Sequence, residues 1–268
     1  MIGAIIGDIV GSRFEFDCGP WTKDFEFVTS DSSWTDDTVM TIAISEALLS
    51  AGTNATTDVI KDECIKSMQK WGKAHIDAGY GLNFIQWIQS NTPKPYGSYG
   101  NGSAMRVSAT GRLYDSLERT LEVAKATAEV THNHPEGIKG AQCTAAVMYL
   151  ARTGSNKQQI RDYVVKNFDY DITASSDELR PLHRHDESCM DSLPKALISF
   201  FEGLSFEDVI RTAVSLGGDT DTIAAIAGAM AGAYYDIPQD VVDLCKSKLT
   251  PHMIERLDKF DVFTKMST

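Results

Sequence analysis

The stretch DTDTIAAIAGAMAGAYY, residues 219–235, carries the strongest structural signal in the chain. From Ile223 to Tyr235 it is apolar on every face of a helix, as expected for a central helix that other helices surround. Alanines recur throughout it, and Gly228 and Gly232 stand four residues apart, so neighbouring helices can approach closely. Packing explains these glycines without any functional role. We therefore expect a helical protein built around this segment.

Helical periodicity also dominates the rest of the chain. Apolar residues recur at helical spacing in five stretches, 40–48, 57–75, 117–131, 138–152 and 205–216. Helices are expected to begin at four prolines, Pro135, Pro194, Pro238 and Pro251. Proline is tolerated at a helix start because its missing N–H would have no partner there. Only residues 24–28, DFEFV, alternate briefly like a strand, so the sequence predicts an all-α fold.

The composition favours one folding unit. The chain has 268 residues, of which 43% are hydrophobic, enough to bury a sizeable core. No Gly/Ser tract, Pro-rich run, charge block or fixed-period repeat marks a boundary between domains. We predict a compact, single-domain multi-helix bundle over residues 1–268. The sequence does not determine the oligomeric state, for which a monomer is our expectation.

Charge and cysteine content restrict the partners and the compartment. A net charge of −12 disfavours nonspecific nucleic-acid binding, and a protein this acidic needs local cations to hold an anionic ligand. Five widely spaced cysteines without a CxxC pair suit a reducing compartment. The N-terminus lacks a basic region and meets Asp8, unlike a signal peptide, and the longest apolar stretch of 13 residues is too short for a membrane span. We expect a soluble, cytoplasmic protein that does not enter membranes.

Two acidic clusters stand far apart in the sequence, and each directly precedes an apolar helical pattern. They are Thr35-Asp36-Asp37 and Asp219-Thr220-Asp221-Thr222. Each would lie at a helix N-terminus, where the partial positive charge of the helix dipole offsets some of the repulsion between carboxylates. The remaining cost is large, because two unit charges about 4 Å apart repel by roughly 4 kcal/mol at an effective dielectric constant near 20.

Capping is the simplest explanation of each cluster taken alone, since Asp, Ser and Thr are common N-caps. Capping needs only one side-chain oxygen at each helix, however, and these clusters offer four aspartates together with threonines. Hard oxygen ligands of this kind suit Mg²⁺, Mn²⁺ or Ca²⁺ rather than zinc. Considered together, the two clusters predict one metal site.

The N-terminal segment combines a packing pattern with one candidate functional acid. Gly3, Gly7 and Gly11 lie along one face of an expected helix, which is first a packing feature. No strand precedes them and the GxGxxG spacing is absent, so this is not a dinucleotide fingerprint. After Gly11 the pattern breaks, and Glu15 would project from a polar, flexible segment just before the first acidic cluster.

Two polar motifs lie in the middle of the chain. Residues 96–106, YGSYGNGSAMR, can expose backbone N–H groups that hold phosphate oxygens, with Arg106 as a charged clamp, although such clusters are more often simple turns. In residues 131–137, THNHPEG, we interpret His132 as a substrate contact and His134 as structural.

Residues 169–192 lack a clear period. Their contiguous His, Asp and Glu residues could bind a transition metal, but a solvated polar loop is the favoured interpretation.

Taken in order, five of these segments resemble the ADP-ribosylglycohydrolase family. They are GDIVGSRFEF (7–16), SWTDDTVMT (33–41), GSYGNGSAMRV (97–107), THNHPEG (131–137) and SLGGDTDTIAAIAGAMAGAYY (215–235). The combination of TDDT with GGDTDT and a following small-residue helix is highly specific. The glycine-rich motifs would be weak signals alone.

The resemblance implies an orthogonal all-α bundle around two Mg²⁺ or Mn²⁺ ions at the floor of a cleft. It implies six metal ligands, Thr35, Asp36, Asp37, Asp219, Asp221 and Thr222, and two catalytic acids, Glu15 on a mobile flap and Asp36. It implies seven substrate-binding residues, Ser98, Tyr99, Gly100, Asn101, Gly102, Ser103 and His132. The role of Asp77, before a glycine-rich turn, stays open.

The reaction implied is hydrolysis of the bond between C1″ of ADP-ribose and an acceptor, with metals that orient the ribose and lower the pKa of a water. Whether Asp36 or Glu15 is the general base stays open. So does the acceptor: an arginine, a serine, an O-acetyl group or a nucleobase. Two alternatives remain, a non-catalytic ADP-ribose-binding or crystallin-like protein and a metal-dependent nucleotide phosphohydrolase. The presence of all six candidate ligands and Glu15 favours an ADP-ribosylglycohydrolase that acts on an ADP-ribosylated protein or other acceptor.

Overall fold

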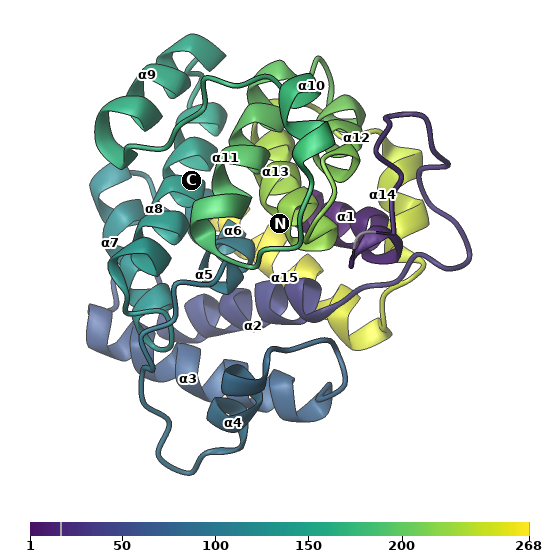
Figure 1. Ribbon diagram of the computed structural model, residues 1–268. Coiled ribbons are helices and arrows are strands. Elements are labelled where there is room, and N and C mark those ends of the chain that lie inside the picture. The colour runs from purple at the N-terminus through teal and green to yellow at the C-terminus, as the bar shows by residue number, and fades with distance from the viewer. Residues whose placement is uncertain (17, 268) are drawn as a thin grey trace.

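A computed structural model describes residues 1–16 and 18–267 of the protein, and these residues form the all-α fold that the sequence predicts (Figure 1). The first half of the chain supplies α1 (Ile2–Gly11), the 3-10 turn η1 (Ser12–Phe14), α2 (Asp36–Ala51), α3 (Thr57–Ala74), α4 (Leu82–Gln89), α5 (Gly102–Met105), α6 (Ser108–Leu113) and α7 (Leu117–Glu129). The second half supplies α8 (Pro135–Arg152), α9 (Lys157–Phe168), α10 (Ser176–Leu179), the 3-10 turn η2 (Arg180–Leu182), α11 (Cys189–Glu202), α12 (Phe206–Ser215), α13 (Thr220–Tyr234), α14 (Gln239–Lys246) and α15 (Pro251–Ser267).

Helix α13 is the central helix of the fold, as its apolar sequence predicts. It packs against α1, α8, α11 and α12, and Figure 1 shows it in the middle of the bundle. Every side chain from Thr220 to Ala231 is buried. Because this helix has no solvated face, polar side chains at its N-terminus lie inside the protein. Within the described ranges, no helix has both the length and the hydropathy needed to cross a membrane.

Glycines bring the backbones of α1 and α13 into direct contact. A Cβ added to Gly7 would lie 2.0 Å from the carbonyl oxygen of Ala224, and one added to Gly3 would lie 2.3 Å from that of Gly228. At the end of this contact, Thr220 Oγ1 donates a hydrogen bond to the carbonyl oxygen of Gly11 at 3.0 Å. The predicted packing role of the glycines is thus confirmed, and it also fixes the start of α13 beside α1.

One expectation about secondary structure is wrong, and one brief strand-like alternation does not form a strand. Residues 24–28 form a loop, in which the carbonyl oxygen of Phe25 accepts a hydrogen bond from the Arg211 guanidinium and the Phe25 ring lies 5.0 Å from it. Pro194 lies inside α11, which begins earlier, where Ser188 accepts a hydrogen bond from the backbone N–H of Asp191. The other three prolines do stand at helix starts, Pro135, Pro238 and Pro251.

Candidate functional site

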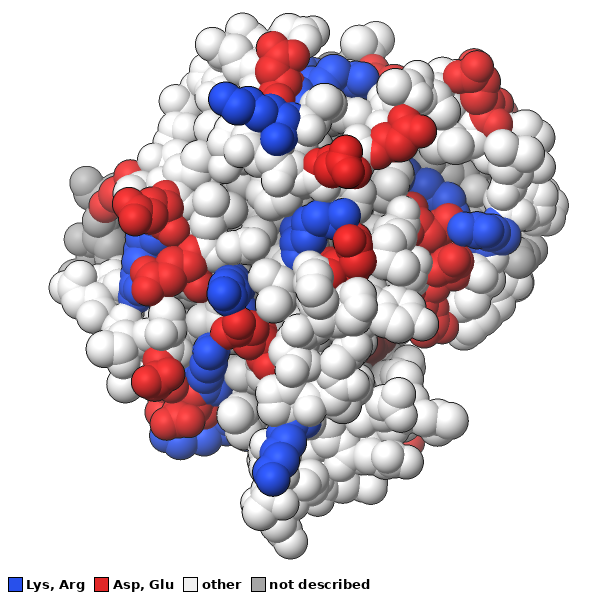
Figure 2. Space-filling view, turned by 60° about the vertical axis from the view of Figure 1, so that its left-hand side comes forward, with Lys and Arg blue, Asp and Glu red and all other residues white. Residues whose placement is uncertain are grey.

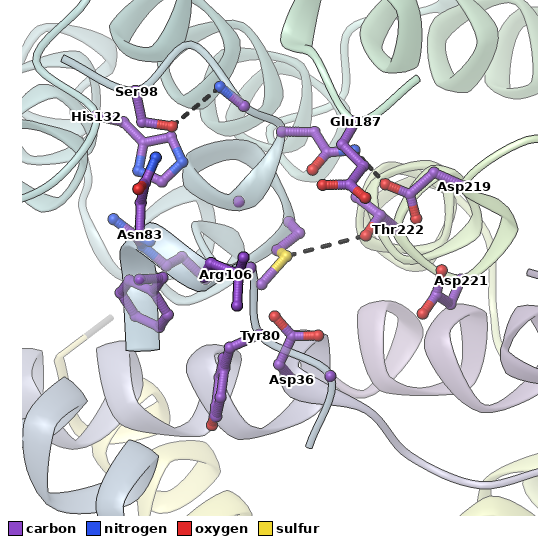
Figure 3. A pocket seen from close by; sticks show the side chains of 18 of the residues that line it. Asp36, Tyr80, Asn83, Ser98, Arg106, His132, Glu187, Asp219, Asp221 and Thr222 are labelled. Carbon is purple, nitrogen blue, oxygen red and sulfur yellow. Dashed lines mark hydrogen bonds between the residues drawn. The ribbon is translucent and has the colours of Figure 1, made fainter. Parts of the chain in front are cut away.

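A cavity of about 640 Å³ opens at the N-termini of α2 and α13 (Figure 3). Its walls come from the segment after α1, the loop between α3 and α4, the glycine-rich loop before α5, and the segment before α11. Ten of the predicted site residues line it, namely Glu15, Asp36, Ser98, Gly100, Asn101, Gly102, His132, Asp219, Asp221 and Thr222. Residues from opposite ends of the sequence therefore meet in one cleft.

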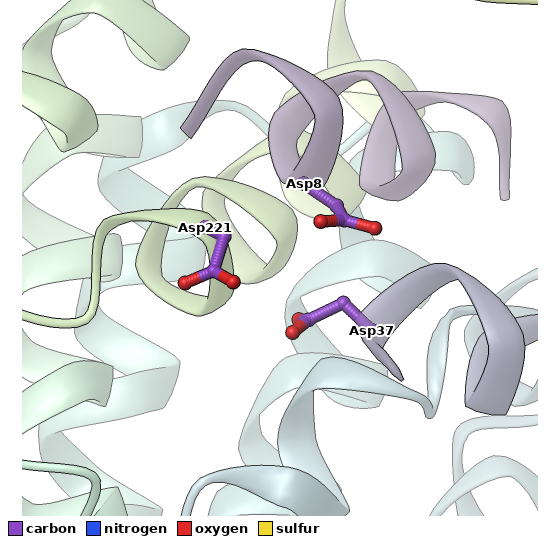
Figure 4. Close-up of side chains that lie close together, drawn as sticks. All are labelled: Asp8, Asp37 and Asp221. Atoms are coloured by element: carbon purple, nitrogen blue, oxygen red, sulfur yellow. The ribbon is translucent and has the colours of Figure 1, made fainter. Parts of the chain in front are cut away.

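The two predicted acidic clusters come together at a site that we call the floor of the cleft. Asp36, Asp219 and Asp221 line the cavity there, whereas Asp37 is not one of its lining residues. Carboxylate oxygens of Asp37 and Asp221 lie within 4.8 Å of each other and of a third acid, Asp8 (Figure 4). A second group, within the same limit, joins Asp221 to Asp219 and Glu15. Thr222 Oγ1 donates to Asp37 Oδ2 at 2.9 Å, which links the starts of α2 and α13 directly.

Asp8 is a site residue that the sequence interpretation missed. It is fully buried in α1, and its carboxylate accepts hydrogen bonds from the backbone N–H and the hydroxyl of both Thr35 and Thr38, at 2.5 to 3.0 Å. Asp8 thereby holds the first turn of α2 against α1. A signal was present in the sequence, since an acid inside an otherwise apolar, glycine-striped helix is rarely without a buried partner.

Electrostatic strain at the floor is evident from the acid pKa values. Burial raises the pKa of Asp8 to about 6, against hydrogen bonds from Thr35 and Thr38 that lower it. Burial raises the pKa of Asp221 to about 7, and the charges of Glu15, Asp8 and Asp36 add to this rise. The pKa values of Asp36, Asp37 and Asp219 also lie well above their ordinary value, because of burial and then of the neighbouring carboxylates. Five carboxyl groups here thus resist ionisation.

The floor has the properties of a cation site. Asp37 Oδ1 and Asp221 Oδ1 are buried and have no hydrogen-bond partner among the described residues, which is costly for an acceptor unless a cation satisfies it. The candidate metal ligands are carboxylate and threonine hydroxyl oxygens, a set that suits Mg²⁺, Mn²⁺ or Ca²⁺. Thr35 caps α2 and donates to Asp8, and its side chain does not line the cavity.

The glycine-rich loop forms one wall of the cleft, and two of its glycines lie close to His132. A Cβ on Gly102 would lie 3.2 Å from His132 Nε2, and one on Gly100 would lie 3.6 Å from the same atom. Asn101 Nδ2 donates to Asp219 Oδ2 at 2.6 Å, so this loop is tied to the acidic floor. Ser98 Oγ accepts from the backbone N–H of Gly100 at 3.2 Å.

Two residues of the same loop lie outside the cavity. Ser103 is fully buried and donates to the carbonyl oxygen of Gly137, a structural contact. The ring of Tyr99 lies 5.5 Å from that of His134 and is 52% exposed. His134 itself is the N-cap of α8, accepting from the backbone N–H of Glu136, so its predicted structural role is confirmed.

His132 and Arg106 close the end of the cavity opposite the acids. His132 is 5% exposed, and burial, with the nearby charge of Arg106, holds its pKa well below the ordinary value. The neutral ring is oriented by a contact of 2.7 Å between Nδ1 and Thr131 Oγ1. Arg106 is buried, and its guanidinium donates to Thr131 Oγ1 and to the carbonyl oxygen of Thr127, so it braces the cleft from within.

Residues 169–192 are not the solvated polar loop that we expected. Tyr170 and Ile172 are buried, and α10 and η2 follow them. The end of the segment pairs with the glycine-rich loop through an antiparallel bridge between Gly100 and Ser188. The backbone N–H of Asn101 donates to the carbonyl oxygen of Glu187 at 2.8 Å, and the Glu187 side chain enters the cleft beside Asp219 (Figure 3). Long-range pairing, which leaves no local pattern, orders this segment.

The loop between α3 and α4 supplies a further wall that the sequence interpretation did not anticipate. The backbone N–H of Asp36 donates to the carbonyl oxygen of Ala78 at 2.8 Å, which fixes this loop against the start of α2. Gly79 to Phe84 then line the cavity, with Tyr80 and Phe84 both buried and their ring centroids 5.4 Å apart. Asp77 precedes this wall but does not line the cavity.

Comparison with known proteins gives consistent matches. The sequence profile of the ADP-ribosylglycohydrolase family matches residues 1–266. Over 314 residues, the chain is 28% identical to the ADP-ribosylhydrolase ARH3 of Homo sapiens, covering 89% of this chain and 85% of ARH3. Over 269 residues, it is 26% identical to the ADP-ribosylarginine hydrolase Tri1 of Pseudomonas putida, covering 88% of this chain and 70% of Tri1.

The fold also has a match among solved structures. An ADP-ribosylglycohydrolase-related protein complex contains a chain that superposes with a TM-score of 0.77 at 22% sequence identity. The superposition covers 100% of this chain and 96% of the other. At this identity the likeness establishes a shared fold.

Proposed function

The chain belongs to the ADP-ribosylglycohydrolase family, and from this premise we propose that it removes ADP-ribose from a modified acceptor by metal-dependent hydrolysis of the bond at C1″. The observation that carries the proposal is the meeting of α2 and α13, whose N-terminal acids face one cleft. The names of two relatives, an ADP-ribosylhydrolase and an ADP-ribosylarginine hydrolase, support the same class of substrate.

We propose that two divalent cations, Mg²⁺ or Mn²⁺, bind at the floor. The carboxylates of Asp36, Asp37, Asp219 and Asp221 would hold them, with Thr35 and Thr222 supplying hydroxyl oxygens. When bound, such cations supply Lewis-acid chemistry, polarising ligand oxygens and lowering the pKa of water. The unpartnered oxygens of Asp37 and Asp221 and the raised pKa values of the floor acids support this assignment.

The glycine-rich loop would hold the ADP-ribose itself. Gly100 and Gly102 leave room for a ligand to approach the backbone beside His132, because neither carries a Cβ. Backbone N–H groups in a turn of this kind bind phosphate oxygens. His132, whose burial keeps it neutral, can hydrogen-bond a ribose hydroxyl without adding charge. Ser98, Tyr99 and Asn101 are the further predicted contacts, and Ser103 would act by holding the loop.

Glu15 is the acid best suited to exchange a proton during the reaction. Burial and the charges of Asp219, Glu187 and Asp8 raise its pKa to about 7, close to the value that favours acid–base catalysis at neutral pH. Its carboxylate lies within 4.8 Å of those of Asp219 and Asp221, at the edge of the proposed metal site. Asp36 is the second candidate, although direct metal binding would reduce its basicity.

The test is a panel of substrates carrying ADP-ribose on arginine, serine, an acetyl group or a nucleobase, assayed with EDTA and with added Mg²⁺ or Mn²⁺. We expect intact ADP-ribose to be released from at least one substrate only with metal. Release of AMP or phosphate would indicate a nucleotide phosphohydrolase. Binding of ADP-ribose without any turnover would indicate a non-catalytic, crystallin-like relative.

We further propose that residues 1–268 form a single domain acting in the cytoplasm on an ADP-ribosylated protein or other acceptor. The state of the cysteines supports a reducing environment, because all five are free thiols and four are buried. The surface supports the exclusion of nonspecific nucleic-acid binding, since Lys and Arg are scattered among acids on the face that Figure 2 shows.

A further inference from the structure

The cleft has more acidic residues than the proposed metals require. Among the residues that the structure describes, five acids line the cavity, Glu15, Asp36, Glu187, Asp219 and Asp221, against one arginine, Arg106. Three of these acids are proposed metal ligands, which leaves Glu15 and Glu187. Arg106 and the neutral His132 lie with the glycine-rich loop, at the end assigned to ADP-ribose. Glu187 lies at the other end, beside Asp219 (Figure 3), and the Glu15 carboxylate lies within 4.8 Å of those of Asp219 and Asp221. This is the end where the acceptor would leave C1″.

Glu187 faces this end of the cleft, and no Lys or Arg among the described residues forms an ion pair with it. Its side chain is 65% exposed and lies close enough to Glu15 and Asp219 for its charge to raise the pKa of both. The nearby cations Arg184 and Lys195 form ion pairs with Asp191, at 3.4 Å and 2.5 Å. Glu187 Oε1 lies 3.1 Å from His185 Nε2, a contact that orients the carboxylate.

Phe16, directly after Glu15, adds an aromatic face to the same place. It lines the cavity although its side chain is 67% exposed, and its backbone φ of 57° lies in the left-handed region. That region is uncommon for a bulky residue and is often associated with functional sites. The Phe16 ring lies 5.1 Å from the ring of His185, so the segment carrying Glu15 contacts the segment carrying Glu187.

We propose that Glu15, Phe16 and Glu187 form an acceptor rim that recognises a guanidinium group, which makes arginine-linked ADP-ribose the substrate. The inference rests on the proposed hydrolase function and specifies its acceptor. A guanidinium is planar, binds carboxylates through paired N–H groups and stacks on aromatic faces, so it matches both components of the rim. A serine O-glycoside or an acetyl ester is neutral and gains nothing from these carboxylates.

The chemistry preserves this match throughout the reaction. Hydrolysis breaks the bond between C1″ and the guanidinium nitrogen and forms a bond between C1″ and the oxygen of water. The nitrogen takes one hydrogen from water in exchange for the sugar, so arginine leaves as a guanidinium ion and the total charge is unchanged. The rim therefore faces a cation in the substrate and in the product.

The test compares two peptides of identical sequence that carry ADP-ribose on arginine or on serine, hydrolysed by the metal-loaded full-length protein. We expect kcat/KM to be at least about tenfold higher for the arginine-linked peptide. Glu187→Gln, which keeps the shape and removes the charge, should lower the ratio of the arginine value to the serine value roughly tenfold. Phe16→Leu should lower the arginine value by about threefold, because it removes the aromatic face.

Glu118→Gln is the matched control, an equal loss of charge on the exposed surface of α7, and should change neither value. The affinity of Glu187→Gln for free ADP-ribose should equal that of the wild type, which shows that the cleft is intact. Equal or faster hydrolysis of the serine-linked peptide, or an equal loss on both peptides in Glu187→Gln, would overturn the acceptor assignment while the hydrolase function stands. Release from neither peptide nor any other ADP-ribosylated substrate would overturn the function itself, and the rim with it.

Discussion

The floor and the rim of the cleft are built in opposite ways. At the floor, Asp37 and Asp221 are 2% and 3% exposed and belong to the first turns of long helices held by backbone packing. At the rim, Phe16 and Glu187 are about two-thirds exposed and belong to irregular segments that contact each other through side chains. The floor is therefore costly to alter, whereas the rim can change without disturbing the helices.

This difference suggests a division of labour. Repelling carboxylates can be kept together only by a rigid frame, and α1, α2 and α13 supply it. Acceptors of different chemistry need contacts that can vary between relatives, and loops that carry few buried groups can supply these. The following predictions test whether the floor controls metal binding, catalysis and protein stability. They also test whether the rim affects only the rate of hydrolysis and the choice of substrate.

Asp221→Ala should have the largest effect on turnover. Asp221 belongs to both groups of close carboxylates, so its loss removes a proposed metal ligand and a neighbour of Glu15. We expect kcat/KM for ADP-ribose release to fall at least about a thousandfold, together with weaker Mg²⁺ affinity by calorimetry. The metal-free protein should unfold at a higher temperature than the wild type, because a repelling buried carboxylate is gone. Wild-type turnover in this variant would eliminate the metal-site proposal.

Gly7→Ala tests the frame rather than the acids. The new Cβ would lie 2.0 Å from the carbonyl oxygen of Ala224, so α1 must move away from α13. We expect the free energy of unfolding, measured with urea, to fall by about 3 kcal/mol. Gly81→Ala is the control for stability, since a Cβ there meets nothing within 4 Å and should change it by less than about 1 kcal/mol. A Gly7→Ala protein as stable as wild type would show that the close helix contact is dispensable.

The sequence predicted the floor better than the rim, for a physical reason. The clusters at Asp36 and Asp219 are each followed by a periodic apolar helix, and periodicity together with charge is visible locally. The 183–188 segment has no period, because its order comes from pairing with a loop about 90 residues away in the sequence, as the bridge between Gly100 and Ser188 illustrates. Asp8 was not identified from the sequence for a related reason: its hydrogen-bond partners Thr35 and Thr38 lie at the start of another helix.

In the metal-free protein, the pH dependence of stability should come from the buried acids of the floor and not from the exposed acid of the rim. The folded-state pKa of Asp8 is about 6 and that of Asp221 about 7, above the value of about 4 for an unfolded aspartate. At pH values between about 4 and 7 the folded state binds more protons than the unfolded state. The stability of the folded state is therefore greatest at low pH and is lost as the pH rises through this range. We expect the Tm in EDTA to be roughly 5 °C lower at pH 8 than at pH 5.

Two comparisons isolate the floor in this measurement. Saturating Mg²⁺ should reduce the difference in Tm, because bound cations replace protons as partners of the carboxylates. Asp37→Asn should also reduce it in EDTA, whereas Glu187→Gln, at the exposed rim, should leave it nearly unchanged. A metal-free Tm that rises between pH 5 and pH 8 would contradict the raised pKa values of the floor acids.

Glu15→Gln should have the smallest effect of the four and should leave the metal site intact. Glu15 lies at the junction of floor and rim, and its side chain is not one of the proposed metal ligands. We expect kcat to fall by about tenfold to a hundredfold while the Mg²⁺ affinity stays within about twofold of wild type. Because its pKa is about 7, the rise of kcat/KM between pH 6 and pH 8 that a general base produces should disappear in the variant. Persistence of that rise in Glu15→Gln would transfer the role of base to Asp36, and loss of Mg²⁺ binding would instead place Glu15 in the floor.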